Sequence, residues 1–389
     1  MTATSGQARA PAVLHIDLGA LVENWRALAR RAAPARCAAV VKADAYGLGA
    51  GLVVRALLTA GCREFFVALV EEGVRLREAL GDDWPGDARV HVLHGPLPGA
   101  EADCLAHGLV PVLNSLDQVM RWRALAQREG RALPAALQVD TGMARLGLPP
   151  SALAGLANQS DGLVGIATTL MMSHLVSAED PQDPMNRRQL ERFQPWSTRF
   201  PGALGCLANS SGIFLGPDFH FDLVRPGAAL YGVAPVLGQP NPMQPVVRVQ
   251  ARLIQWRELP AGEAVGYNHT WRAARRTRLA TVSVGYADGY LRSASNRGQL
   301  RFQGRPVPVV GRVSMDTVTV DVTDVAPEAL SPGALFDVID EVQDINALAQ
   351  AAGTNAYEIL TSLGARYHRH YLSPVPGRPA QPATPEIPC

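Results

Sequence analysis

The chain has 389 residues, of which 47% are hydrophobic and 18% are charged, and its formal net charge of +1 argues against a nucleic-acid-binding protein. No apolar run approaches the roughly 18 residues that span a membrane, and the first residues lack the basic-then-apolar pattern of a signal peptide. Five scattered cysteines favour reduced thiols and a cytoplasmic location over a disulfide framework or a metal site.

The first part of the chain alternates short apolar runs with longer segments of helical spacing. The runs predict buried parallel strands at 38–42, 65–68, 90–93, 110–113, 135–139, 163–173, 204–207 and 221–224. Segments between them, such as 52–60, 71–80, 116–128 and 187–196, have the spacing of helices. Unbroken alternation with eight strands predicts an α/β fold, a (β/α)8 TIM-type barrel over residues 12–240 that follows a flexible N-terminus at 1–11.

The pattern changes at a proline-rich segment, residues 238–245, which we interpret as a linker. Strand-like runs follow at 246–254, 279–284, 300–302, 307–310, 317–322 and 336–339, with a helical segment at about 346–363. They predict a mainly-β C-terminal domain over residues 241–372. The proline-rich segment 373–389 is predicted to be a disordered tail.

Lysine occurs once in the chain, at position 42, although Lys and Arg together number 36. Arginine serves where only a positive charge is needed, but its guanidinium does not lose a proton and attack a carbonyl carbon. Lys42 ends the first predicted barrel strand, and the C-terminal ends of barrel strands carry the catalytic groups of this fold. Burial there would lower the pKa of the amine and favour a nucleophile that bonds to a carbonyl substrate or to pyridoxal phosphate (PLP). A lysine that merely extends to solvent from a strand end is the alternative.

Eight motifs carry a resemblance to a known family, and they extend from about residue 16 to residue 369. They are VVKADAYG (40–47), VDTGMARLG (139–147), MSHLVSAED (172–180), LANSSG (207–212), VRPGAALYG (224–232), AVGYNHTW (264–271), VGYADGY (284–290) and GRVSMD (311–316). Together they resemble the alanine racemases, which are PLP-dependent enzymes built from a barrel and a β domain. The order and spacing of the motifs make the resemblance highly specific.

The resemblance implies a cofactor site at the barrel end. Lys42 would hold PLP covalently, and Arg225 would face the pyridine nitrogen and keep it unprotonated, because a guanidinium stays charged. Tyr46 resembles a phosphate contact, with a packed tyrosine at the barrel rim as the alternative role. The remaining cofactor contacts that the resemblance implies are His174, Asn209, Ser210 and the backbone N–H groups of Gly227 and Ala228.

The resemblance also implies two catalytic bases, one on each face of the substrate. Lys42 would act on the Cα proton of the D-isomer and Tyr267 on that of the L-isomer. A tyrosine has an ordinary pKa of about 10 and needs a partner, which the family pattern identifies as His174, itself hydrogen-bonded to Arg225. Family members place the tyrosine in the active site of the other subunit, which implies a homodimer with shared sites.

Substrate contacts are implied as well. Arg145 and the N–H of Met315 resemble the groups that bind the substrate carboxylate, while Tyr286 and Asp316 resemble a narrow entrance. Some relatives orient the arginine with a carbamylated lysine, but this chain has Gln138 there and no second lysine. Ala365 occupies a position that is a phosphate-binding tyrosine in some relatives, so the phosphate lacks one contact or uses Tyr367 or Arg366.

The function expected from the resemblance is interconversion of L- and D-alanine, which supplies D-alanine for peptidoglycan. A racemase of broader specificity is the main alternative, since side-chain selectivity depends on the size of the pocket. The related decarboxylases pair the pyridine nitrogen with a carboxylate and carry a late Cys-Asp motif, which this sequence lacks. A non-catalytic PLP-binding homeostasis protein would lack the second domain that carries Tyr267. No nucleic acid, membrane or metal partner is expected.

Overall fold

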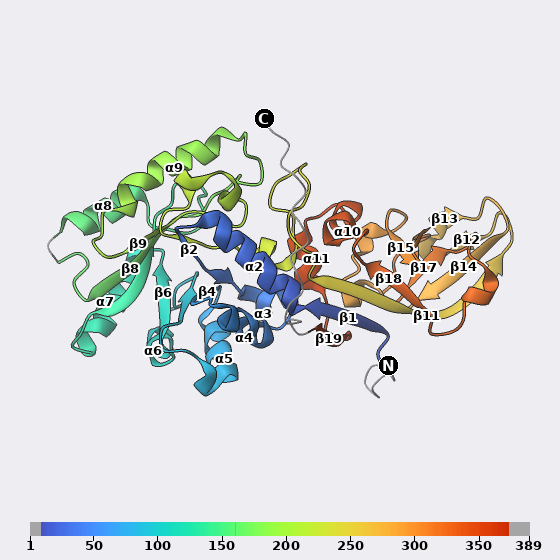
Figure 1. Cartoon of the computed structure of the whole chain (residues 1–389), viewed down its shortest axis with the longest axis horizontal. Coiled ribbons are helices and arrows are strands. Elements are labelled where there is room, and N and C mark those ends of the chain that lie inside the picture. The colour runs from blue at the N-terminus through green and yellow to red at the C-terminus, as the bar shows by residue number, and fades with distance from the viewer. Residues whose placement is uncertain (1–8, 160, 373–389) are drawn as a thin grey trace.

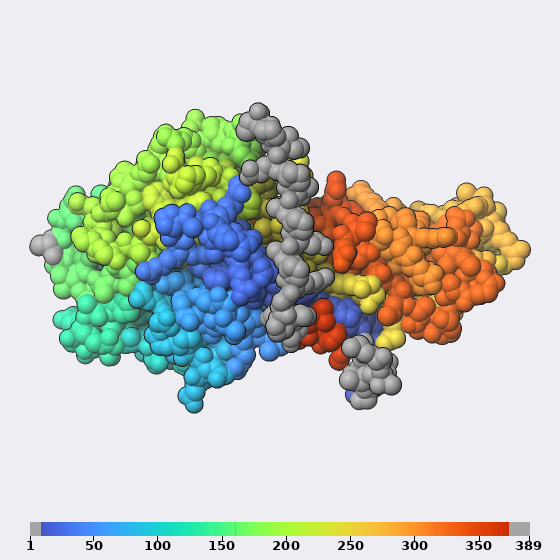
Figure 2. Space-filling view, in the orientation of Figure 1, coloured from blue at the N-terminus to red at the C-terminus, as the bar shows by residue number. Residues whose placement is uncertain are grey.

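The computed structural model describes residues 9–159 and 161–372, which form a barrel and a narrower, strand-rich C-terminal lobe (Figures 1 and 2). The predicted tail and residues 1–8 of the predicted flexible N-terminus lie outside the described residues. Within the described ranges, no helix is long and apolar enough to cross a membrane.

Seven parallel strands form a curved sheet in chain order. They are β3 (Ala39–Val40), β4 (Glu64–Val67), β5 (Arg89–Val92), β6 (Leu109–Leu113), β7 (Leu133–Gln138), β8 (Ile166–Met172) and β9 (Leu204–Cys206). A further strand, β10 (Leu223–Val224), pairs in parallel with β2 (Arg36–Cys37), which lies one residue before β3. Backbone N–H groups of Asp222 and Arg225 donate to the carbonyls of Gly205 (3.0 Å) and Ala208 (2.9 Å), beside β9. These contacts close the ring of strands and confirm the predicted barrel.

Helices cover the outside of the barrel. They are α2 (Leu18–Ala32), α4 (Ala50–Ala60), α5 (Val70–Leu80), α6 (Glu101–Ala106), α7 (Leu116–Arg128), α8 (Pro150–Asn158) and α9 (Pro184–Ser197). Because the helices cover one face of the strands and the packed barrel interior covers the other, all residues of β4 and β6 are buried.

The C-terminal domain is built on an eight-stranded sheet. Its long strand β11 (Val247–Leu259) pairs with β18 (Leu335–Ile339) and, beyond an irregularity near Leu253, with β14 (Thr277–Val282). The other strands of the sheet are β1 (Ala12–Asp17), β15 (Gln299–Phe302), β16 (Arg305–Pro308), β17 (Val318–Asp321) and β19 (His368–Leu372). A separate hairpin is formed by β12 (Ala264–Val265) and β13 (Trp271–Arg272). Helices α10 (Ile345–Ala352) and α11 (Ala356–Ser362) replace the single helical segment expected from the sequence, because Gly353 ends α10 with φ +70° and Asn355 caps α11.

Both ends of the described chain join the C-terminal sheet. Residues 12–17 fall within the predicted barrel range, but β1 (Ala12–Asp17) pairs antiparallel with β11 and parallel with β19. The linker is held to helix α2 by Asn24, whose amide donates to the carbonyl of Gln244 and accepts from its N–H (2.9 and 2.8 Å). The two domains therefore share strands and contacts on both sides of the linker.

Candidate active site

Lys42 follows β3 at the C-terminal end of the barrel strands. His174 follows β8, Asn209 and Ser210 follow β9, and Arg225 follows β10, so these side chains are brought to the same end of the barrel. This is the end at which enzymes of this fold assemble their catalytic groups. The structure therefore gathers the barrel residues that the sequence analysis proposed for the site.

The backbone after Lys42 forms an unusual turn, α3 (Lys42–Gly47). Ala43, Asp44, Ala45 and Tyr46 all have φ between +52° and +55°, the left-handed region. Each such residue costs about 1 to 2 kcal/mol in an L-amino acid, so surrounding contacts must hold the turn. Among those contacts, Asp44 accepts from the N–H of Ala50 (2.7 Å).

The last strand of the C-terminal domain also holds this turn. From β19, Arg369 donates to the carbonyl of Gly47 (2.6 Å) and the Tyr371 hydroxyl donates to that of Leu48 (3.0 Å). The segment that follows Lys42 is therefore fixed by residues more than 300 positions away in the sequence.

The amine of Lys42 lies in a cationic environment. Burial lowers its pKa, and the positive charges of Arg145 and Arg225 lower it further, while the carboxylate of Glu72 opposes them. An amine in these surroundings loses its proton more readily than an exposed lysine, which suits a nucleophile or a general base.

The side chain of Arg225, one of the two arginines that act on Lys42, is buried. Its Nη2 donates to the carbonyls of Ser173 (2.6 Å) and Leu207 (3.3 Å), and its Nε donates to Sγ of Cys206 (3.0 Å). The family pattern implies a further hydrogen bond from Arg225 to His174, but the described Arg225 side chain does not make it. The ring of Phe66 lies below the guanidinium, at 5.8 Å from its carbon to the ring centroid.

His174 is held neutral by its surroundings. Burial lowers the pKa of its imidazole to about 3, with further contributions from the positive charges of Arg225, Arg145 and Lys42. Its backbone carbonyl accepts a hydrogen bond from Gln189 (2.8 Å). The uncharged ring can therefore donate one hydrogen bond and accept another near neutral pH.

Hydroxyl and backbone N–H groups converge beside β10. The Ser210 hydroxyl oxygen accepts from the N–H groups of Gly227 (2.9 Å) and Ala229 (3.2 Å), and Asn209 accepts from that of Gly212 (2.9 Å). A side-chain carbon at Gly227 would lie only 2.4 Å from the Tyr46 hydroxyl. Only glycine lets the backbone and the tyrosine hydroxyl approach this closely.

Tyr46 also belongs to an aromatic cluster at this site. Its buried ring lies 4.7 Å from that of Tyr231 and 6.4 Å from that of Tyr357, measured between centroids. Tyr357, from α11, was not predicted as a site residue, because only the folded chain brings that helix to the barrel. Burial raises the pKa of Tyr357 to about 12, so its hydroxyl keeps its proton and can donate.

Gln138 is the last residue of β7, and Arg145 lies on the loop that follows this strand. The buried amide of Gln138 donates to the backbone carbonyl of Leu146 (3.1 Å), next to Arg145, and not to the guanidinium itself. Gln138 therefore fixes the backbone beside Arg145. The positive charge of Arg145 lowers the pKa of both Lys42 and His174.

The remaining predicted site residues lie in the C-terminal domain. Tyr267 follows β12 and is 66% exposed, and β12 lies at the end of that domain farthest from the barrel (Figure 1). Met315 and Tyr286 are also exposed, and the Tyr286 N–H donates to the carbonyl of Ser314 (3.1 Å). A single chain does not bring Tyr267 to Lys42.

The two residues suggested as substitutes for a phosphate-binding tyrosine are engaged elsewhere. Arg366 binds both oxygens of Asp288 (2.8 and 2.7 Å) and one of Asp316 (2.6 Å). Tyr367 is buried in the core of the C-terminal domain, where it and Tyr290 line the same small pocket. The tyrosine of the C-terminal domain whose ring lies beside that of Tyr46 is Tyr357, at 6.4 Å between centroids.

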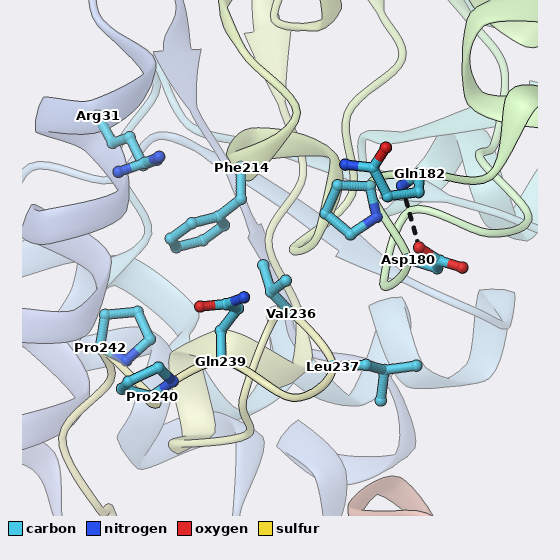
Figure 3. A pocket seen from close by; sticks show the side chains of 10 residues that line it. Arg31, Asp180, Gln182, Phe214, Val236, Leu237, Gln239, Pro240 and Pro242 are labelled. Carbon is cyan, nitrogen blue, oxygen red and sulfur yellow. Dashed lines mark hydrogen bonds between the residues drawn. The ribbon is translucent and has the colours of Figure 1, made fainter. Parts of the chain in front are cut away.

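A separate cavity of about 430 Å³ opens on the surface and shares no residue with the predicted site (Figure 3). The Arg31 guanidinium lies 4.4 Å from the ring centroid of Phe214 on one side, and the N–H of Gln182 donates to Asp180 on the other. The other lining residues are Pro181, Val236, Leu237, Gln239, Pro240 and Pro242.

Comparisons with known proteins identify the family of the chain. The family model for the alanine racemase N-terminal domain matches residues 16–235, and that for the C-terminal domain matches residues 246–371. The chain is 50% identical over 364 residues to an alanine racemase of Rhodospirillum rubrum, covering 93% of this chain and 96% of that protein. It is 48% identical to a catabolic alanine racemase of Agrobacterium fabrum, covering 93% and 92%.

A solved structure gives the same result. The crystal structure of alanine racemase from Bartonella henselae with covalently bound pyridoxal phosphate has a TM-score of 0.88 and 42% identity to this chain. The match covers 93% of this chain and 100% of the other. The two family models cover most of the sequence, and the chain belongs to the alanine racemase family.

Proposed function

We propose that this protein is a PLP-dependent racemase that interconverts L-alanine and D-alanine. The observation that carries the proposal is Lys42, the sole lysine, at the C-terminal end of a barrel strand with a lowered pKa beside Arg225. The family relationship supports it, since the related protein of Bartonella henselae has PLP covalently bound.

The residues present fit this cofactor. The Ser210 hydroxyl, the Ala228 N–H and the Tyr46 hydroxyl would supply neutral donors for a phosphate, with a glycine where a side chain would collide. The Gly227 N–H, which donates to the Ser210 hydroxyl oxygen (2.9 Å), would join them by turning to the phosphate. Asn209 holds the loop that presents Ser210. When bound, PLP supplies the electron sink that makes the Cα proton of an amino acid labile.

Arg225 sets the electronic character of the site. Its guanidinium stays protonated and is fixed by three hydrogen bonds, so it would present a permanent positive charge to the pyridine nitrogen. A nitrogen that stays unprotonated withdraws electrons less strongly, which would favour return of the Cα proton over side reactions.

Lys42 and Tyr267 would exchange the Cα proton from opposite faces. The lowered pKa of Lys42 makes the free amine available as a base for the D-isomer. We assign the L-isomer to Tyr267, with a nitrogen of the neutral His174 imidazole as hydrogen-bond partner of its hydroxyl.

This assignment needs a homodimer, in which Tyr267 of one chain completes the site of the other. The exposure of Tyr267 and its distance from the barrel within one chain support the proposal. Met315, Tyr286 and Asp316 would arrive from the same domain, with the Met315 N–H on the substrate carboxylate and the other two at the entrance. Arg145 would bind that carboxylate from the barrel side, with Gln138 holding its loop.

Reaction type and substrate range can be tested together. The purified protein is incubated with PLP and each L-amino acid in turn, and the products are separated by chiral chromatography. We expect D-alanine to form much faster than any other D-isomer. Comparable rates with larger amino acids would favour a racemase of broader specificity, and no D-isomer from any substrate would contradict the proposal.

The face assigned to each base has its own test. In Tyr267→Phe, washout of α-deuterium should slow more from L-alanine than from D-alanine. Equal slowing from both isomers would argue against a face-specific role for Tyr267.

We further propose that the reaction occurs in the cytoplasm and supplies D-alanine for peptidoglycan. The cysteines that the structure describes, Cys37, Cys62, Cys104 and Cys206, are free, which agrees with a reducing compartment. The catabolic name of the Agrobacterium fabrum relative favours a second role, degradation of D-alanine. Deleting the gene separates the two: a requirement for added D-alanine indicates supply, whereas failure to grow on D-alanine as carbon source indicates degradation.

A further inference from the structure

Glu72 makes three hydrogen bonds next to Lys42, and none of the sequence motifs includes it. Its Oε1 accepts from the N–H of Ala43 (2.7 Å), the residue directly after the lysine. Its Oε2 accepts from the N–H groups of Ala68 (2.7 Å) and Leu69 (3.2 Å). We propose that Glu72 is a positioning residue for Lys42, which ties the lysine turn to the neighbouring strand end and places a negative charge beside the amine. The inference rests on the proposed role of Lys42.

The two oxygens of Glu72 join two adjacent loops of the barrel. Ala43 follows β3, and Ala68 and Leu69 follow β4, so one carboxylate fixes the ends of both strands relative to each other. A carboxylate is suited to this role because it accepts on both oxygens, whereas a glutamine amide would direct an NH₂ group at one of the N–H donors.

The contact between Glu72 and the N–H of Ala43 lies at the start of the turn that follows Lys42. Ala43 is the first of the four left-handed residues, and its N–H is adjacent to the lysine Cα. The backbone bond from the Ala45 N–H to the Val41 carbonyl (2.9 Å) also spans this part of the turn. The other side-chain contacts act farther along: Asp44 binds the N–H of Ala50, and Arg369 binds the carbonyl of Gly47. Glu72 therefore controls the part of the turn that sets where the Lys42 side chain begins.

Glu72 also balances the charges around the amine. Arg145 and Arg225 are the cations that act on Lys42 from the loops after β7 and β10, and His174 is neutral. Tyr46 from the same turn is also neutral, because burial raises the pKa of its hydroxyl, and Asp44 is bound to Ala50. Within the described chain, Glu72 is the anion that acts on the amine, and it favours the protonated form that the two arginines oppose.

The single lysine makes a direct test possible. The full-length chain without cofactor is reductively methylated with ¹³C-formaldehyde, which labels Lys42 and the N-terminal amine only, and the Lys42 signal is titrated by NMR. We expect Glu72→Gln to lower the pKa of Lys42 by about one unit, because removing a nearby opposite charge disfavours the protonated amine. Glu71→Gln is the matched control, since Glu71 is exposed on the same helix and pairs with Arg75 (2.8 Å). Equal titration in both variants would overturn the electrostatic part of the proposal.

Glu72→Asp tests the positioning part and serves if Glu72→Gln does not fold. It keeps the charge but shortens the side chain by one methylene, so it cannot reach both loops. We expect hydrogen exchange of the Ala43 amide to become at least tenfold faster than in the wild type. Unchanged protection of that amide would show that Glu72 does not hold the turn. Neither the titration of Lys42 nor the exchange of the Ala43 amide depends on turnover. Activity retained in Lys42→Ala would therefore refute the proposed function, and the two readouts would still test the role of Glu72.

Discussion

Nε of Arg225 donates a 3.0 Å hydrogen bond to Sγ of Cys206 in the interior of the barrel. Burial raises the pKa of the Cys206 thiol, so a neutral sulfur accepts this bond from a charged guanidinium. The other bonds of Arg225 go to backbone carbonyls, which leaves Cys206 as its side-chain partner. The orientation of the proposed partner of the cofactor nitrogen therefore depends on Cys206.

We predict that Cys206→Ala lowers both stability and activity. Losing a hydrogen bond to a buried charged group costs about 2 kcal/mol, and a misoriented guanidinium should lower kcat/KM about tenfold, which corresponds to about 1.4 kcal/mol. Urea unfolding and initial rates measure the two effects. Cys206→Ser should recover most of both, because a hydroxyl also accepts; wild-type values in Cys206→Ala would refute the role.

Gly227→Ala should weaken PLP binding by at least tenfold. The added carbon would lie 2.4 Å from the Tyr46 hydroxyl, so one of the proposed phosphate contacts must move. Binding is followed by cofactor absorbance during titration of the cofactor-free protein. Gly155→Ala, at an open position with no atom within 4 Å, is the control and should bind PLP as the wild type does. Equal affinity in the two variants would contradict the proposed cradle.

Acid should destabilise the protein partly through His174. Its pKa is about 3 in the folded chain and about 6.5 when unfolded. The unfolded state therefore takes up a proton first as the pH falls, so stability is lost between about pH 6.5 and pH 3. His174→Gln should lose less unfolding free energy than the wild type between pH 7 and pH 4, and a substitution of the exposed His94 is the control for loss of a histidine. Parallel pH profiles for wild type and His174→Gln would contradict the burial of a neutral imidazole.

Shared active sites predict complementation between two inactive variants. A mixed dimer of Lys42→Ala and Tyr267→Phe chains would contain one site with both bases. After subunit exchange at equal concentrations, about a quarter of wild-type activity should return, because half of the dimers are mixed and each has one intact site. Each variant incubated alone is the control. Absence of recovery, with mixed dimers demonstrated by mass, would argue that each site is formed within one chain.

Much of the fold could be predicted because barrel strands are short, apolar and regularly spaced. The place of β1 could not, since its partners β11 and β19 lie more than 200 residues away and its apolar residues would suit a barrel strand equally well. The left-handed turn from Ala43 to Tyr46 contains no glycine or asparagine, and a single aspartate, Asp44, does not mark four consecutive positive φ angles.

The site shows a similar division. Lys42 could be found from its unique count and strand-end position, and the motifs led to Arg225 and Ser210. Glu72 and Tyr357 lie in helices, where acidic and aromatic residues are common and do not by themselves indicate a site. Only folding brings Glu72 to the lysine turn and Tyr357 to Tyr46. Contacts made between elements, rather than within a motif, were beyond the reach of the sequence.

The most direct test of the central claim is to identify the residue that holds the cofactor. The protein is loaded with PLP, reduced with borohydride and digested, and the modified peptide is sequenced by mass spectrometry. We expect a single pyridoxyl group on Lys42, with no label and no racemisation in Lys42→Ala. A label confined to the N-terminal amine, or full activity in Lys42→Ala, would contradict it.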